Sequence, residues 1–167
     1  DIFLIAFAVP EFVMTALPII LSAAFIPLFA GIRQRAGEAV AWHLGRQVGA
    51  RLLLLLLMVV ALGALSAPLY IRWLAPGFED WERAASVQAL YRMLPGIIFM
   101  GGANLVTAAL HVYRRFARPA LAAALNNLVF VATLLGLPLI WAVGRAAWGV
   151  TLGAVSALVV QLPLLWS

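Results

Sequence analysis

The chain has 167 residues, of which 66% are hydrophobic and only 10% are charged, whereas an ordinary soluble domain carries about 25% charged residues. This composition excludes a soluble globular fold, and the absence of cysteine excludes disulfides, thiol catalysis and cysteine metal sites. The net charge is +5, but the basic residues are all arginine and are divided among separate segments, so we expect no nucleic-acid partner.

Five segments contain no Asp, Glu, Lys or Arg: 12–32, 52–71, 93–113, 119–144 and 146–167. An α-helix rises about 1.5 Å per residue, so about 20 apolar residues cross a hydrocarbon core of about 30 Å. Every one of these segments reaches that length. The sequence therefore predicts an all-α fold, a polytopic transmembrane helix bundle with about five membrane-spanning helices and no separate soluble domain.

The first predicted helix covers residues 2–30 and contains Pro10, Pro18 and Pro27. Each proline removes a backbone donor and tends to kink a helix, so we expect this element to be bent or broken. The second helix is predicted over residues 47–73.

The last three helices are predicted over residues 80–113, 119–142 and 146–167. The segment Ala75-Pro76-Gly77-Phe78 has the composition of a turn. Asp80 follows it and offers an N-cap for the third helix.

Arginine near the helix ends predicts the orientation, because cytoplasmic loops of membrane proteins are enriched in basic residues. The first and third connecting segments hold seven of the arginines, and the second and fourth hold four. We therefore expect the first segment, 33–51, and the third to be cytoplasmic. The third is the turn that carries Arg114, Arg115 and Arg118.

Enzyme signatures are absent from the sequence. There is no lysine and hence no phosphate-binding Gly-Lys-Ser/Thr loop, no Gly-x-Ser-x-Gly elbow and no His-Glu-x-x-His motif. His43 and His111 are far apart and have no carboxylate at helical spacing. We expect no catalysis, no metal site and no cofactor.

Charged residues within or beside the spans are candidates for substrate or ion contacts. Asp1 and Glu11 bracket an apolar stretch near the predicted extracytoplasmic end of the first helix. For Glu11 the alternative is an ordinary interfacial residue. Arg92 lies about twelve residues into the third helix, and it either faces a cavity or extends its stem to the interface.

Amides and small residues give a second set of candidates. Asn126 and Asn127 are adjacent, and two adjacent amides are costly to expose to lipid, so at least one should face the bundle or a wet cavity. Cavity lining and structural hydrogen bonding remain alternatives for them. Gly149 and Gly153 form a Gly-x-x-x-Gly pattern that is typical of helix packing.

A series of short motifs follows in order along about 130 residues of the chain. They are Asp1-x-Phe3 with Ala6-Phe7-x-x-Pro10, Ser22-x-Ala24-Phe25-x-Pro27, Ala67-Pro68, Ala75-Pro76-Gly77-Phe78, Arg92 before Pro95, and Tyr113-x-Arg115-Phe116-x-x-Pro119-Ala120 followed by Asn127. Their order and spacing resemble the MviN/MurJ family of lipid II flippases.

This resemblance implies that residues 1–167 form part of the N-terminal lobe, helices two to six, of a fourteen-helix transporter of the multidrug/oligosaccharidyl-lipid/polysaccharide exporter superfamily. The missing first helix and second lobe would then be its partners. It further implies a multi-pass protein of the bacterial cytoplasmic (inner) membrane, where it flips an undecaprenyl-pyrophosphate-linked cell-wall precursor by alternating access. Coupling to an ion or to the membrane potential is expected from the superfamily. Asp1 matches a family acid of the central cavity, whose lining would include Asn104 and Asn127.

The sequence departs from the family where a pair of arginines usually follows Pro10. Met14 and Thr15 stand there instead, and neither replaces the charge-assisted contacts that arginine makes with a pyrophosphate. Two alternatives therefore remain: a same-fold exporter of another polyprenyl-linked oligosaccharide, and a non-transporting membrane scaffold.

Overall fold

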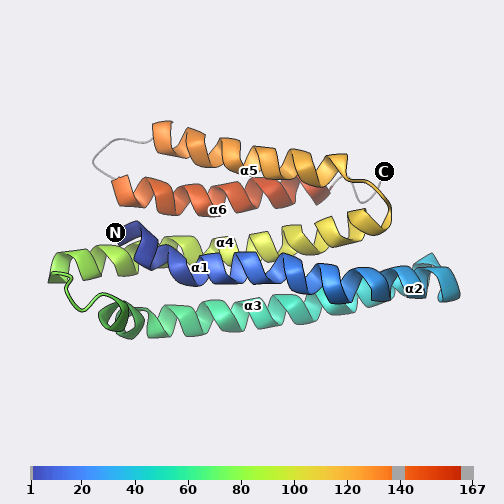
Figure 1. Ribbon diagram of the computed structural model, residues 1–167, viewed down its shortest axis with the longest axis horizontal. Helices are drawn as coiled ribbons and strands as arrows, with labels where there is room; N and C mark the ends of the chain where they lie inside the picture. The colour runs from blue at the N-terminus through green and yellow to red at the C-terminus, as the bar shows by residue number, and fades with distance from the viewer. Residues whose placement is uncertain (1, 137–141, 163–167) are drawn as a thin grey trace.

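The computed structural model describes residues 2–136 and 142–162, and within them the chain is helical without a strand (Figure 1). The elements are α1 (Ile2–Ile20), η1 (Leu21–Phe25), α2 (Ile26–Ala36), α3 (Glu38–Leu74), α4 (Asp80–Val112), α5 (Ala117–Gly136) and α6 (Ala142–Gln161). Five helical rods are long and apolar enough to cross a membrane, with α1, η1 and α2 forming one of them. This confirms the predicted all-α membrane bundle.

The first rod is not broken at its prolines. Pro10 and Pro18 lie inside α1, and Pro27 is at the start of α2. A proline ring clashes with the carbonyl four residues earlier and offers no N–H to it. The π-helical turn η1 lies just before Pro27, and there the Ile26 N–H bonds the Leu21 carbonyl, five residues back. This wider turn accommodates the proline, so the helix continues to Ala36.

Helix α3 begins at Glu38, earlier than the predicted start at residue 47. The prediction was wrong because arginines were interpreted as loop residues, although a helix that leaves the hydrocarbon carries them easily. Gly37 forms the turn between α2 and α3 with φ of 89°, a left-handed conformation that favours glycine. Helix α3 has 37 residues, about 55 Å at 1.5 Å each, so it exceeds the hydrocarbon core.

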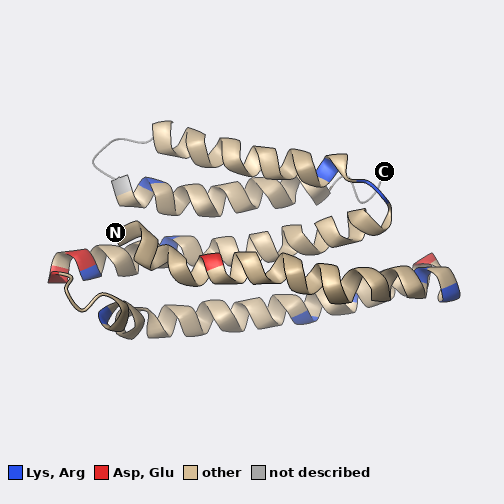
Figure 2. Ribbon diagram, in the orientation of Figure 1, with Lys and Arg blue, Asp and Glu red and all other residues tan. Residues whose placement is uncertain are grey.

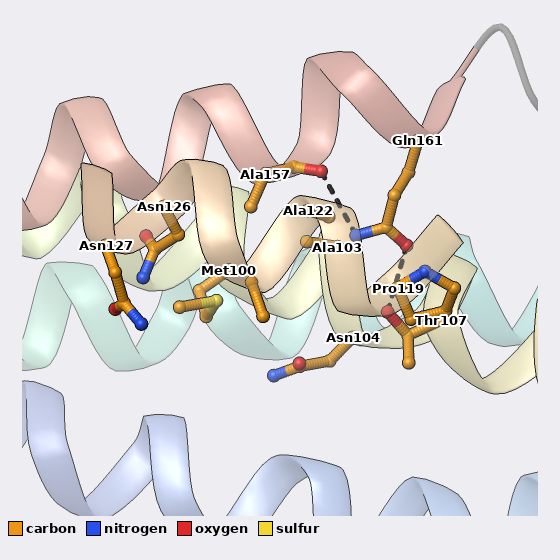
Figure 3. Close-up of a pocket in the computed structure, with 11 residues that line it drawn as sticks. Met100, Ala103, Asn104, Thr107, Pro119, Ala122, Asn126, Asn127, Ala157 and Gln161 are labelled. Atoms are coloured by element: carbon orange, nitrogen blue, oxygen red, sulfur yellow. Dashed lines mark hydrogen bonds between the residues drawn. The ribbon is translucent and has the colours of Figure 1, made fainter. Parts of the chain in front are cut away.

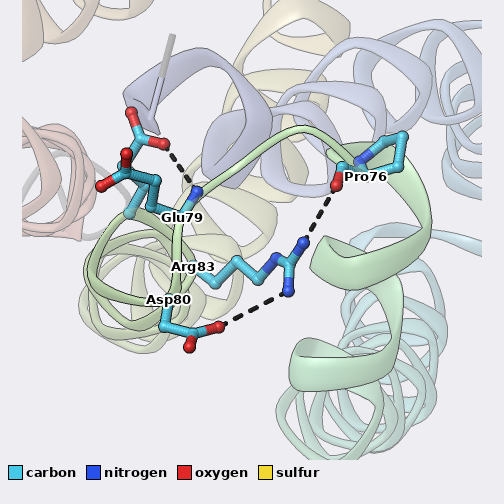
Figure 4. A network of polar contacts seen from close by, with 5 residues as sticks. Pro76, Glu79, Asp80 and Arg83 are labelled. Carbon is cyan, nitrogen blue, oxygen red and sulfur yellow. Dashed lines mark hydrogen bonds and ion pairs between the residues drawn. The ribbon is translucent and has the colours of Figure 1, made fainter.

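The turn between α3 and α4 is held by its own polar groups (Figure 4). Arg83 donates from Nη2 to the Pro76 carbonyl at 2.9 Å and lies 3.6 Å from Asp80 Oδ1. The Glu79 N–H donates to Glu82 Oε2 at 2.9 Å, as in a capping box. Glu79, and not the predicted Asp80, is therefore the N-cap, because Glu82 pairs with the residue three positions earlier.

Helix α4 is the centre of the bundle. It packs against α1, α3 and α6, and half of the residues in its most apolar stretch are buried. Helix α5, in contrast, packs mainly against α6. Within the leucine run 52–57 of α3, Leu56 alone is buried. Leucines so exposed on a spanning helix are suited to contact with lipid.

The first and third connecting segments meet at one end of the bundle, as predicted (Figure 1). Tyr113, after α4, donates from its hydroxyl to Glu38 Oε1 at 2.6 Å, and the Arg33 guanidinium lies 4.2 Å from the centre of the Tyr113 ring. Trp42 stacks on the same ring. Burial raises the pKa of Tyr113, and the bond to Glu38 raises it further, so the hydroxyl stays protonated at neutral pH. Most charges in Figure 2 gather near the bundle ends.

Single cysteines test the orientation directly, because the chain contains none. Ala36, the last residue of α2, and Gly77, in the turn between α3 and α4, are exposed and lie at opposite ends of the bundle. In a cysteine-free full-length background, Gly77→Cys in intact cells should react with an impermeant thiol reagent. Ala36→Cys should react only after the membrane is permeabilised. Labelling of residue 36 alone, or equal labelling, would contradict the predicted orientation.

Candidate functional site

A cavity of about 240 Å³ lies between α4, α5 and α6 (Figure 3). Five of its lining residues carry amide or hydroxyl side chains, and no charged residue is among the described residues that line it. The polar five are Asn104 and Thr107 of α4, Asn126 and Asn127 of α5, and Gln161 of α6. Such a set provides neutral hydrogen-bond donors and acceptors inside a membrane-spanning bundle.

A hydrogen bond between α4 and α6 lies beside the cavity, together with a second bond within α6. Thr107 donates from Oγ1 to Gln161 Oε1 at 2.9 Å, and Gln161 Nε2 donates to the Ala157 carbonyl at 3.1 Å (Figure 3). Gln161 is only 2% exposed, so its amide needs these partners. Thr107 and Gln161 therefore have a structural role.

Asn104 is different, because its amide nitrogen is buried and has no hydrogen-bond partner among the described residues. Figure 3 shows this amide pointing away from the Thr107–Gln161 pair. Leaving a buried donor without a hydrogen bond costs about 1–3 kcal/mol, unless water or a ligand accepts a hydrogen bond from it. Asn104 is thus the lining residue best prepared to bind a polar group that enters the cavity.

The two adjacent asparagines of α5 both line the cavity. Asn126 is half-buried and lies against α6, where a Cβ built on Gly153 would be 2.6 Å from Asn126 Oδ1. Asn127 is exposed. Asn126 is therefore the amide turned into the bundle, and Asn127 is the more available of the two to a ligand.

The predicted site residues do not all come together. The structure brings Asn104 and Asn127 to one cavity, but Asp1 lies outside the described residues. Arg92 is half-buried on α4, and its carbonyl accepts a hydrogen bond from Thr151 Oγ1 at 2.6 Å. Neither Arg92 nor Glu11 is among the described residues that line the cavity.

Glu11 lies on an exposed face of α1. Phe12 and Thr15 are exposed on the same face, whereas Met14 is half-buried against the core. Glu11 lies halfway along α1, inside the first membrane-spanning rod, where a carboxylate is costly to expose to lipid. This face is therefore suited to contact with water or with another part of the protein.

The three arginines of the third connecting segment lie after the end of α4 and at the start of α5. Arg114 is exposed and has φ of 55°, and its N–H donates to the His111 carbonyl at 3.0 Å. The Arg115 N–H donates to the Leu110 carbonyl at 3.0 Å. These bonds end α4. Arg118 is half-buried at the start of α5. Arg114 and Arg115 thus belong to a helix-ending turn, and none of the three arginines is among the described residues that line the cavity.

Sequence reasoning missed the pairing of Thr107 with Gln161 and the cluster around Tyr113. Thr107 and Gln161 are 54 residues apart, and no local pattern indicates that they meet. Tyr113 is the first residue of the motif that contains Arg115 and Phe116, but nothing in the local sequence places Glu38 beside it. Helix packing alone creates both contacts.

Two comparisons with known proteins indicate the same family. The family model described as "Lipid II flippase MurJ" matches residues 1–167. A "Lipid II flippase MurJ" of Burkholderia cenocepacia is 28% identical over 172 residues, which cover 98% of this chain and 33% of that protein. The chain thus spans about a third of the length of this curated relative. Since the family model matches the whole chain, the chain belongs to the MurJ family of lipid II flippases, a family of multi-pass membrane transporters and not of enzymes.

Proposed function

We propose that the chain is part of a transporter that flips a lipid-linked cell-wall precursor, lipid II or a close analogue, across the bacterial inner membrane. The family match over all five spans carries this proposal. The name of the Burkholderia relative agrees with it. Residues 1–167 would form part of the N-terminal lobe, and the remainder of the protein would supply the first helix and the second lobe.

Two surfaces support a transport role. The cavity at Asn104 and Asn127 offers neutral amides, which suit the hydroxyl and amide groups of a glycan or peptide headgroup. The exposed α1 face with Glu11 and Thr15 is suited to the central pathway, where the second lobe would cover it. Asp1 is proposed as a further pathway acid from the family resemblance. Alternating access would move the headgroup through water while the polyprenyl tail stays in lipid.

One observation favours a second candidate, the export of another polyprenyl-linked oligosaccharide. Thr15 is exposed on the α1 face, where a family arginine would reach the pathway, and Met14 packs against the core. This lobe therefore offers no cation at either position to bind a pyrophosphate. Other helices would have to supply that cation if lipid II is the substrate. Coupling to an ion or to the membrane potential is likewise a proposal.

Complementation separates these candidates. The full-length protein should restore growth to bacteria depleted of their own lipid II flippase, and its membrane abundance should be measured by immunoblot. Thr15→Arg should be tested beside the wild type, because it restores a cation at this position. The introduced guanidinium would lie one helical turn from Glu11 on the same face. If the wild type is abundant but fails while Thr15→Arg rescues, lipid II is not the native substrate. Failure of both at normal abundance would exclude lipid II flipping.

A further inference from the structure

A second crevice lies between the end of the π-helical turn, α3 and α4, near the arginine-rich end of the bundle. Its volume is about 150 Å³. Its wall is apolar, with Phe25, Trp42, Leu105 and Val106, and Arg46 is its only charged lining residue among those described. Gly45 and Gly49 bring α3 close to the neighbouring rods, because a Cβ there would lie 3.3 Å from the Phe29 ring and 3.2 Å from Leu105 respectively.

The position of the crevice along the bundle matches a membrane interface. On α4, residues 93–113 carry no charge, and Leu105 and Val106 are within that run. On α3, charge begins at Arg51 and continues outward through Arg46. The crevice therefore has one wall in an uncharged segment and the other in a charged one, as at the depth where acyl chains meet headgroups.

Arg46 is available to an anion. Its side chain is exposed, and within the described residues it has neither a hydrogen bond nor an ion pair. In the described part of the chain, Glu38 is the acidic residue at this end of the bundle, and it already accepts a hydrogen bond from the Tyr113 hydroxyl. Arginine binds phosphate strongly through its planar set of donors, and a partly apolar setting strengthens that contact.

We propose that this crevice binds one anionic phospholipid from the leaflet at the arginine-rich end. The lipid phosphate would lie at Arg46, and an acyl chain would pack against Phe25, Leu105 and Val106. The apolar wall selects a lipid over free phosphate, and the cation selects an anionic lipid over a zwitterionic one. This inference is independent of the transported substrate.

Native mass spectrometry of the full-length protein tests the site, with phosphatidylglycerol and phosphatidylcholine of equal chain length as probes. Arg46→Ala should lower the affinity for phosphatidylglycerol about tenfold, the size of one charge-assisted contact. Val106→Trp, which fills the crevice and keeps the arginine, should lower it similarly. Arg51→Ala is the matched control, because Arg51 is also exposed on α3 but does not line the crevice. It should change the affinity by less than about twofold.

Further measurements distinguish a lipid site from other causes. Arg46→Lys should retain part of the binding, and inorganic phosphate should not displace the lipid. Melting curves recorded beside each variant separate lost binding from lost folding, and Arg46→Gln replaces Arg46→Ala if that variant melts early. Equal losses for Arg46→Ala and Arg51→Ala would show only diffuse attraction and overturn the proposal. Undiminished binding by Val106→Trp, or equal affinity for both lipids, would overturn it as well.

Discussion

Gly153→Ala is expected to lower the free energy of unfolding by about 1–3 kcal/mol, the usual range for overpacking a tight contact. The added Cβ would lie 2.6 Å from Asn126 Oδ1 and 2.9 Å from the Asn126 carbonyl oxygen. The side-chain oxygen can rotate away, but the carbonyl moves only if α5 moves. The variant should therefore push α5 from α6, and its melting temperature in detergent should fall.

Two other glycines provide graded controls. At Gly149 the added Cβ would lie 2.8 Å from the Phe130 ring, which can tilt, so Gly149→Ala should have a smaller effect. At Gly136, near the end of α5, nothing lies within 4 Å, so Gly136→Ala should leave the melting temperature unchanged or raise it. Equal melting temperatures for all three variants would contradict close packing at Gly153.

The spans were predictable from the sequence because the requirement for about 20 apolar residues is local and strong. Helix ends were less predictable. Arg46 and Arg51 led to a late predicted start for α3, since the sequence does not distinguish a loop from a helix that continues into the headgroup layer. Residue type favours Asp80 as the N-cap, yet the reciprocal contact between Glu79 and Glu82 decides the cap.

The candidate site was predictable only in part. The family resemblance indicated Asn104 and Asn127. A pair of adjacent amides in a membrane span is a further signal, and it indicated Asn126 and Asn127. It does not indicate that Asn104 lines the same cavity or that its nitrogen lacks a partner, because both depend on how α4, α5 and α6 pack. In the same way, the replacement at Met14 and Thr15 is visible in the sequence. That Thr15 alone is exposed is a property of the fold.

Asn104→Leu is expected to reduce transport by the full-length protein about tenfold without destabilising it. Leucine removes the buried, unpartnered amide nitrogen, and apolar replacement of an unsatisfied group is often neutral or stabilising. A substrate or water that accepts from this nitrogen would lose one hydrogen bond, and about 1.4 kcal/mol corresponds to a factor of ten. A rise in the melting temperature together with a fall in transport would therefore separate binding from folding.

Thr133→Val is the matched control for Asn104→Leu. Thr133 is a half-buried polar residue of α5 whose Oγ1 donates to the Val129 carbonyl at 2.7 Å, and it does not line the cavity. Transport should be measured as the rate at which substrate headgroups become accessible on the far side of the membrane, corrected for protein abundance. If Asn104→Leu transports as well as Thr133→Val, the cavity between α4, α5 and α6 is a packing defect and the substrate takes another path. If Asn104→Leu instead lowers the melting temperature, the amide is a structural group whose partner lies in the remainder of the protein.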